Sequence, residues 1–294
     1  MKFQGCYVAI ITPFTSDDKV DEKGLRSNIE FLIKKGVAGI VPCGTTGESA
    51  TLNWDEHNHV VDIAIDQAAG RVTVIAGAGS NNTSEAVAGA KHAEKSGADA
   101  ILCITPYYNK PTQEGLYQHF KAVSQAVKIP IVVYNVPGRT GINLLPETLE
   151  KLCDFENIAA VKEASGNVPQ VSEIHRRCAG RLDILSGDDG LTLPILSVGG
   201  KGVISVVGNI VPDKMSAMID LYLKGQHSEA LKIHEELAEL SESMFLESNP
   251  VPVKNAMNHY GLAAGTVRLP LVDMREDNKQ KLLSVLKKYT VTLS

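Results

Sequence analysis

The sequence has no cluster of basic residues and no long apolar run, and these two absences exclude broad classes of partner. Its 294 residues carry a formal net charge of -5, with Lys and Arg scattered along the chain. Because binding to phosphate backbones needs clustered positive charge, we expect no nucleic-acid partner. No apolar stretch approaches the roughly 20 residues that cross a bilayer, so we expect no membrane partner. A small anionic substrate is still compatible with this composition, because a local pocket can be basic on an acidic protein.

The cysteines form no pattern that indicates a disulfide framework or a zinc knuckle. They are odd in number, widely spaced and without a CxxC: Cys6, Cys43, Cys103, Cys153 and Cys178. This arrangement is typical of reduced thiols in a cytosol. The first five residues, Met-Lys-Phe-Gln-Gly, also lack the hydrophobic region and the cleavage site of a signal peptide. We therefore expect a cytoplasmic protein.

The motifs of several cofactor and metal sites are missing too. Residues 77–82 approach the dinucleotide-binding pattern GxGxxG but fail at its third glycine, which disfavours a Rossmann-type sheet, the second choice of fold. No Lys-Ser/Thr follows Gly47, so the Walker pattern is absent. His57 and His59 lie two positions apart on an expected helix, where their side chains would diverge and make a poor pair of metal ligands. Metal catalysis therefore has little support in the sequence.

Short apolar segments rich in β-branched residues alternate with longer segments that have helical spacing. The short segments are apolar on both sides of the expected strand, as in a parallel sheet that is covered on both faces. Eight strand–helix pairs at intervals of roughly 20–33 residues predict an α/β fold, a (β/α)₈ or TIM barrel. The expected strands are residues 7–12, 39–44, 72–77, 100–105, 131–135, 158–162, 183–187 and 202–206.

Helix signals agree with this fold and continue beyond the eighth pair. Asn53 can cap a helix with an acidic first turn, and Pro146 and Pro212 occupy positions where first-turn prolines belong. The last seventy or so residues again have apolar residues at helical spacing, which predicts a C-terminal helical extension packed on the barrel. We therefore expect two domains, a catalytic barrel over residues 1–225 and a helical domain over residues 226–294.

Barrel enzymes work at the carboxyl ends of their strands, and there the sequence places one lysine, Lys162. It interrupts an apolar strand, where burial disfavours the charged amine and lowers its pKa. A neutral amine is what imine formation with a ketone requires, so Lys162 is the candidate nucleophile. The alternatives are a structural lysine paired with Glu163, or a lysine that extends outward to solvent. Because adjacent strand residues face opposite ways, Lys162 and Glu163 cannot both point into the barrel.

Other strand ends carry groups that suit a small acid. The turn at residues 44–48, Gly-Thr-Thr-Gly-Glu, offers backbone amides and two hydroxyls for a carboxylate or phosphate; alternatively, it is a tight turn that simply needs glycine. Tyr134 can relay protons, or be a core tyrosine with a satisfied hydroxyl. Arg139 can clamp a carboxylate with its forked guanidinium, or form a surface ion pair.

Five motifs and two further segments together carry a resemblance to a known family. The match runs from end to end in consistent order and spacing. The sequence resembles the dihydrodipicolinate synthase family, which belongs to the N-acetylneuraminate lyase superfamily of class I aldolases. The motifs are GTTGESATL at 44–52, TPYYNKP at 105–111, YNVPGRTG at 134–141, VKEA at 161–164 and SGDD at 186–189, and segments 202–206 and 249–254 extend the match.

The resemblance implies a lyase that uses Schiff-base chemistry and no cofactor. It would condense pyruvate with L-aspartate-4-semialdehyde, a step of the diaminopimelate route to lysine. Lys162 would form the imine with pyruvate, and the resulting enamine would attack the aldehyde. Tyr134, Thr45 and Tyr108 would form a proton relay, with Tyr108 reaching across a dimer interface.

The remaining substrate contacts also follow from the resemblance. Thr45 and Thr46 would bind the pyruvate carboxylate, aided by the backbone near Ile204, and Gly187 matches a further substrate-binding position. Arg139 would guide the semialdehyde. Another pyruvate-dependent class I aldolase or lyase, acting on a sugar acid, is the alternative function, and a non-catalytic keto-acid sensor is a third. Arg139 and the two tyrosines at 107–108 favour the synthase.

Family members are commonly homotetramers built as dimers of dimers, and many are inhibited by lysine at a dimer interface. The resemblance therefore implies a homotetramer and a feedback site. Trp54 stands where lysine-sensitive enzymes of the enterobacterial type have a histidine, whereas Glu85 offers a carboxylate to the inhibitor's ammonium group. The matching positions are Ser49, Ala50, Trp54, His57, Asn81, Glu85 and Tyr107.

Overall fold

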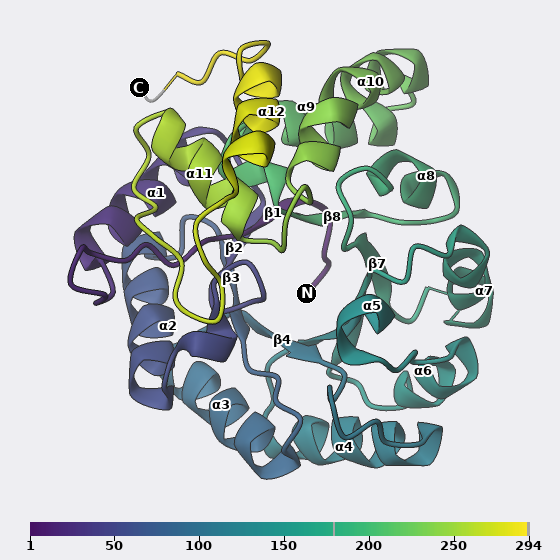
Figure 1. Cartoon of the computed structure of the whole chain (residues 1–294). Helices are drawn as coiled ribbons and strands as arrows, with labels where there is room; N and C mark the ends of the chain where they lie inside the picture. The colour runs from purple at the N-terminus through teal and green to yellow at the C-terminus, as the bar shows by residue number, and fades with distance from the viewer. Residues whose placement is uncertain (179, 293–294) are drawn as a thin grey trace. The chain divides into compact units, whose positions relative to one another are not determined.

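The strands of this protein pair in sequence order and close into a parallel barrel. The structure, a computed structural model, describes residues 1–178 and 180–292, and within this part of the chain eight strands run from β1 next to β2 through to β8 (Figure 1). The expected (β/α)₈ fold is confirmed. The strands are β1 Gly5–Ala9, β2 Gly39–Val41, β3 Thr73–Gly77, β4 Ala100–Ile104, β5 Ile131–Asn135, β6 Ile158–Glu163, β7 Asp183–Ser186 and β8 Gly202–Ser205.

Two of the expected strands end three residues earlier than the sequence suggests. β1 stops at Ala9 and not at residue 12, and β2 stops at Val41 and not at residue 44. After β2 the chain enters a turn in which Cys43 has a positive φ of 54°, a conformation that no strand contains. Apolar composition predicts burial at these ends correctly, but it does not reveal where the backbone leaves the sheet.

The helices begin and end close to their sequence signals. Asn53 caps α2 in a capping box with Glu56, and Pro146 and Pro212 open α6 and α9. The helices are α1 Glu22–Lys34, η1 Ser49–Thr51, α2 Trp54–Ala68, α3 Thr83–Ser96, α4 Gln113–Ala126, α5 Pro137–Thr140, α6 Pro146–Leu152, α7 Val168–Cys178, α8 Thr192–Ser197, η2 Val207–Asn209, α9 Pro212–Leu223, α10 His227–Ser243, α11 Val251–His259 and α12 Glu276–Leu286.

The chain falls into two compact units. The first comprises Met1–Gly5 and Ile75–Ile204, and in it α3 packs on α4, α4 on α6 and α6 on α7 (Figure 1). The second comprises Cys6–Val74 and Ser205–Ser294. In this second unit α1 packs on α2, α9 on α10, and α12 on both α10 and α11. The C-terminal helical extension is thus confirmed, while the domain boundary after residue 225 stays a prediction.

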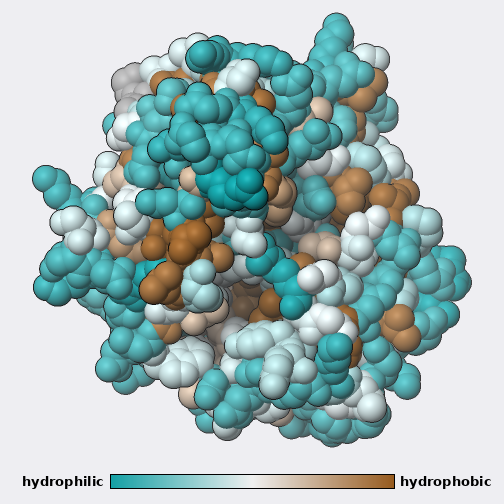
Figure 2. Space-filling model, in the orientation of Figure 1, coloured by the Kyte–Doolittle hydropathy of each residue, from teal (hydrophilic) through white to brown (hydrophobic). Residues whose placement is uncertain are grey.

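The barrel strands are buried along nearly their whole length, and polar residues cover the outside. Every residue of β5 is buried, as the sequence predicts for a strand of a covered parallel sheet. Figure 2 shows a mostly hydrophilic face with hydrophobic residues in small groups. None of the helices within residues 1–178 and 180–292 is both long and apolar enough to cross a bilayer.

Candidate active site

Lys162 and Tyr134 face each other from neighbouring strands. They are direct partners in the register between β6 and β5, so their side chains leave the sheet on the same side. The Lys162 ammonium nitrogen lies 4.3 Å from the centre of the Tyr134 ring, and only 5% of Lys162 is exposed. Both side chains are therefore held in contact, with little access for water.

Burial shifts the pKa of Lys162. Loss of solvation lowers it from 10.5 to about 8; the charge of Asp189 raises it and that of Arg139 lowers it further. At neutral pH about a tenth of such an amine is unprotonated. This fraction is far larger than for an exposed lysine, and it is the form that attacks a carbonyl carbon.

Asp189 is a member of this site that sequence reasoning passed over. The pair Asp188-Asp189 has no helical or strand periodicity that would orient it, so it resembled an ordinary polar loop. In the structure Asp189 is buried, and its carboxylate acts on Lys162 through space. Its position after β7, one strand along from β6, was the signal that could have identified it.

Glu163 does not pair with Lys162, so that alternative interpretation is wrong. Its buried carboxylate accepts hydrogen bonds from Asn135 Nδ2 at 3.0 Å and from the backbone N–H of Ser165 at 2.7 Å. Asn135 and Glu163 are register partners, one position beyond Tyr134 and Lys162. Strand alternation thus places the reactive pair on one side of the sheet and this hydrogen-bonded pair on the other.

Asn135 also holds the segment that carries Arg139. Asn135 Oδ1 accepts from the backbone N–H of Leu144 at 2.9 Å, and Asn135 Nδ2 donates to Asn143 Oδ1 at 2.8 Å. The chain between these contacts forms α5, which contains Arg139. Arg139 is exposed, and its charge acts on Lys162.

Gly187 lies directly against Lys162. A Cβ atom at Gly187 would stand 3.1 Å from Lys162 Cε and 2.7 Å from Ala164 Cβ, so any larger residue would displace the lysine. Ile204, near the end of β8, is fully buried. Lys162, Tyr134, Arg139, Gly187 and Ile204 all belong to the first unit.

Thr45 and Thr46 belong to the second unit, in the turn that follows β2. Thr46 is buried, with 2% exposed, and Thr45 is half-buried. The turn is closed by a hydrogen bond from Thr12 Oγ1 to the carbonyl of Gly47 at 2.7 Å and from the Glu48 N–H to the carbonyl of Thr45 at 3.1 Å. The two hydroxyls are therefore attached to a well-fixed backbone.

Tyr108 is 89% exposed, whereas a tyrosine in the middle of a packed site would be buried. Its backbone has a positive φ of 70°. Its neighbour Tyr107 is also exposed. Within the described part of the single chain, no hydrogen bond or ring contact joins Tyr108 to Lys162 or Tyr134.

The seven residues of the expected lysine site lie in two groups, one in each unit. Ser49 and Ala50 form η1, and the Trp54 ring at the start of α2 packs on the ring of His57 with 5.0 Å between their centres. In the first unit, Ser80 Oγ donates to Glu85 Oε2 at 2.7 Å. Asn81 and Tyr107 belong to the same unit. The Asn81 carbonyl accepts a hydrogen bond from Asn109 Nδ2 at 2.8 Å, and Tyr107 is exposed.

No set of three or more His, Cys, Asp or Glu side chains gathers as a metal site in the described part of the chain, residues 1–178 and 180–292. The thiols of Cys43 and Cys103 are buried, and burial raises the pKa of both, that of Cys103 to about 12. These two thiols are therefore inert core residues and not nucleophiles.

Comparison with known proteins identifies the family. The model of the dihydrodipicolinate synthetase family matches residues 2–289. The chain belongs to the dihydrodipicolinate synthetase family. It is 53% identical over 287 residues to 4-hydroxy-tetrahydrodipicolinate synthase of Geotalea daltonii, covering 98% of this chain and 99% of the relative. The expected resemblance is thereby confirmed, and this family member is an enzyme.

Solved structures agree with the sequence comparison. Dihydrodipicolinate synthase from Aquifex aeolicus superimposes with a TM-score of 0.96 at 48% identity, covering 98% of each chain. The enzyme from Cyanidioschyzon merolae, solved with lysine bound, gives a TM-score of 0.95 at 40% identity, covering 97% of this chain and 98% of that one. The barrel and its C-terminal helices are thus those of the family.

Proposed function

We propose that this protein catalyses the 4-hydroxy-tetrahydrodipicolinate synthase reaction, the condensation of pyruvate with L-aspartate-4-semialdehyde. The observation that carries the proposal is a buried lysine, Lys162, whose pKa is lowered to about 8 by desolvation and whose amine lies against the Tyr134 ring. The names of relatives that are 50–54% identical support the choice of substrates.

In the first half of the reaction, neutral Lys162 attacks the keto carbon of pyruvate. The carbinolamine loses water to give an imine, and loss of a methyl proton from the imine gives an enamine. Tyr134, the neighbour of the amine, is suited to move these protons. Thr45 and Thr46 bind the carboxylate with their hydroxyls, and the backbone near Ile204 assists them.

In the second half, the enamine carbon attacks the aldehyde carbon of the semialdehyde, and the new alkoxide takes a proton from the relay. Arg139 holds the semialdehyde carboxylate, since a guanidinium donates two parallel hydrogen bonds to such a group. The substrate amino group then attacks the imine carbon, closes the ring and releases Lys162. Gly187 leaves room for the adduct beside the lysine, because any side chain there would meet Lys162.

Tyr108 completes the proton relay from a second subunit, together with Thr45 and Tyr134. Its 89% exposure in the single chain supports this role, because a side chain that projects from its own subunit is available to a neighbour. We accordingly propose a homotetramer built as a dimer of dimers, located in the cytoplasm.

Lysine inhibits the enzyme by feedback at a dimer interface formed by Ser49, Ala50, Trp54, His57, Asn81, Glu85 and Tyr107. The lysine-bound structure of the Cyanidioschyzon merolae relative supports this proposal. Trp54 stands where sensitive enzymes of the enterobacterial type have a histidine, and its ring packs on His57. A lysine titration that leaves the activity unchanged at millimolar concentrations would reject it.

Borohydride reduction in the presence of pyruvate, followed by peptide mapping, tests the central step. The expected result is one adduct on Lys162, absent in Lys162→Ala. Tyr108→Phe should keep the adduct but turn over slowly, whereas loss of the adduct would give this tyrosine a structural role. Adduct formation without turnover of aspartate semialdehyde would favour a lyase that acts on a sugar acid.

A further inference from the structure

A segment near the C-terminus, residues 249–254, contacts the turn at residues 44–48, which contains Thr45 and Thr46 and is called the threonine turn below. Asn249 contacts Thr46, and Lys254 contacts Glu48, two positions further along the same turn. All four residues are buried and belong to the second unit. The turn is therefore fixed at two points by a part of the chain that is more than 200 positions away in sequence; Thr46 and Asn249 are 203 positions apart.

The contact between Asn249 and Thr46 sets the direction of one hydrogen bond. Asn249 Nδ2 donates to Thr46 Oγ1 at 2.9 Å, with 5% and 2% of these residues exposed. A threonine hydroxyl has one proton to donate and lone pairs that accept. Since the amide occupies a lone pair of Oγ1, the hydroxyl proton is left to donate elsewhere. Thr46 is thus prepared to donate to an acceptor, and an ionised carboxylate is a strong acceptor.

We infer that Asn249 is a positioning residue, which fixes the Thr46 hydroxyl as a donor to the carboxylate of the keto-acid substrate. The inference rests on the proposed function, because it takes Thr46 as a carboxylate-binding residue. Asn249 acts through Thr46 and need not touch the substrate.

The ion pair at the other end of the segment keeps Asn249 in place. Lys254 Nζ lies 2.5 Å from Glu48 Oε1, and each side chain is only 1% exposed. Lys254 Nζ also donates to the carbonyl of Thr266 at 2.8 Å and lies 4.2 Å from the centre of the Phe14 ring. Removing two charges from water is costly, so such a pair is better suited to fix a geometry than to add stability.

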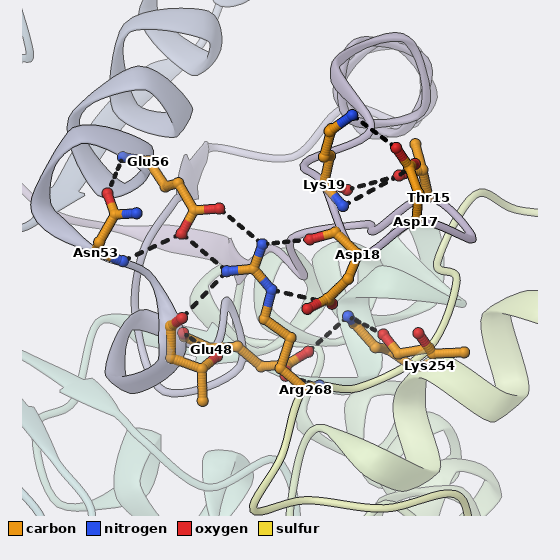
Figure 3. A network of polar contacts seen from close by, with 11 residues as sticks. Thr15, Asp17, Asp18, Lys19, Glu48, Asn53, Glu56, Lys254 and Arg268 are labelled. Carbon is orange, nitrogen blue, oxygen red and sulfur yellow. Dashed lines mark hydrogen bonds and ion pairs between the residues drawn. The ribbon is translucent and has the colours of Figure 1, made fainter.

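Arg268 extends this anchor to the residues that follow the turn (Figure 3). Its backbone N–H donates to Glu48 Oε2 at 3.0 Å, so both oxygens of the Glu48 carboxylate are engaged. Its guanidinium binds both carboxylate oxygens of Glu56, at 2.8 and 2.7 Å, and the carbonyl of Thr51 at 3.1 Å. The turn, η1 and the first turn of α2 are in this way bound to one C-terminal segment.

The substitution Asn249→Asp tests the inference because it reverses the direction of the hydrogen bond to Thr46. It also adds a negative charge, and a Thr46→Val background separates that effect from the effect of the hydrogen bond. A carboxylate at position 249 accepts hydrogen bonds and cannot donate them, so the Thr46 hydroxyl would donate to it. Only lone pairs of Thr46 Oγ1 would then face the substrate carboxylate. We expect the KM for pyruvate to rise about tenfold to a hundredfold, the range for one hydrogen bond to a charged group. The kcat at saturating pyruvate should change less than threefold or so. Asn249→Ala, which frees the hydroxyl to rotate, should raise the KM by less.

Asn28→Asp is a matched control in the same unit. Asn28 is also a buried asparagine whose Nδ2 donates, at 2.6 Å, but to the backbone carbonyl of Ala263. The Asn28→Asp variant should have a lower melting temperature and an unchanged KM for pyruvate. A Thr46→Val background supplies the second control, since the effect of Asn249→Asp should disappear there.

The outcomes separate this inference from the proposed function. Failure of the wild type to form the Lys162 adduct would overturn the proposed function. If the wild type forms the adduct but folded Asn249→Asp keeps the wild-type KM, the positioning role is wrong. The same follows if the KM effect persists undiminished in Thr46→Val. Should Asn249→Asp not fold, an unchanged KM in Asn249→Ala would overturn the inference.

Discussion

Two buried lysines of this protein, Lys162 and Lys254, have similar surroundings, and we propose opposite roles for them. Each is at most 5% exposed, and each nitrogen lies over an aromatic ring, at 4.3 Å for Tyr134 and 4.2 Å for Phe14. Burial lowers the pKa of both amines. Desolvation and a neighbouring ring are therefore not sufficient to make a lysine a nucleophile.

The carboxylates around them account for the difference. Glu48 forms an ion pair with Lys254 at 2.5 Å, and the carbonyl of Thr266 accepts a hydrogen bond from the same ammonium group. Lys162 has the charge of Asp189 acting through space, opposed by that of Arg139. An amine that a direct ion pair holds in its charged form has no lone pair to offer a ketone, whereas an amine without such a pair can lose its proton and attack. Local pairing, more than burial, thus separates the proposed nucleophile Lys162 from the ion-paired Lys254.

The largest expected effect comes from exchanging Lys162 for methionine, which removes the nucleophile. Turnover should fall by at least about a thousandfold, because no other group can form the imine. Steady-state assays and borohydride trapping measure this loss. Lys254→Met is the matched variant, and its adduct on Lys162 should still form. An adduct that survives in Lys162→Met would place the chemistry elsewhere and end the comparison.

Lys254→Met should instead act on stability. It leaves the buried Glu48 carboxylate without its cation, and we expect a loss of about 3–5 kcal/mol in the free energy of unfolding. Urea denaturation measures the change. The double variant Glu48→Gln, Lys254→Met should recover part of it, because the uncompensated charge is gone. A single variant as stable as the wild type would mean that the pair is dispensable.

The dependence of stability on pH should reveal the difference between the pKa of Lys162 in the folded protein and its pKa in the unfolded protein. Its pKa of about 8 in the folded protein lies below the ordinary 10.5, so the unfolded chain binds more protons between these values. Wild-type stability should therefore rise with pH from about 8 to 10.5, by about 3 kcal/mol in total. The difference between the unfolding free energies of the wild type and Lys162→Met isolates this contribution. A difference that stays constant across the window would show an unshifted pKa.

The smallest effect is expected for Phe14→Leu. The Phe14 ring lies 4.2 Å from both the Lys254 nitrogen and the Arg268 guanidinium carbon, so the substitution removes two cation–π contacts and some packing. We expect a loss of about 1–2 kcal/mol in thermal or urea unfolding. Phe31→Leu is the control, because the cation at its ring, the Lys35 nitrogen, lies 5.9 Å from the ring centre, farther than either cation at Phe14. Equal losses in the two variants would remove the cation–π contribution.

Much of the fold could be predicted because its signals are local. Both-sided apolar strands, the cap at Asn53 and first-turn prolines at Pro146 and Pro212 each depend on a few neighbouring residues. Strand ends were less predictable, since Cys43 gives no sign in the sequence that its backbone turns with a positive φ. The domain boundary near residue 225 and the roles of the site residues stay predictions.

The sequence by itself determined the closed α/β barrel, the family and the choice of Lys162, because hydrophobic period and motif order can be read along the chain. Only the tertiary structure decided that Glu163 turns away to Asn135, that Asp189 acts on Lys162, and that Asn249 and Lys254 hold the threonine turn. These contacts join residues up to 206 positions apart in the chain. Their partners are selected by packing and by the need to satisfy buried charges and hydrogen bonds, and neither leaves a local pattern.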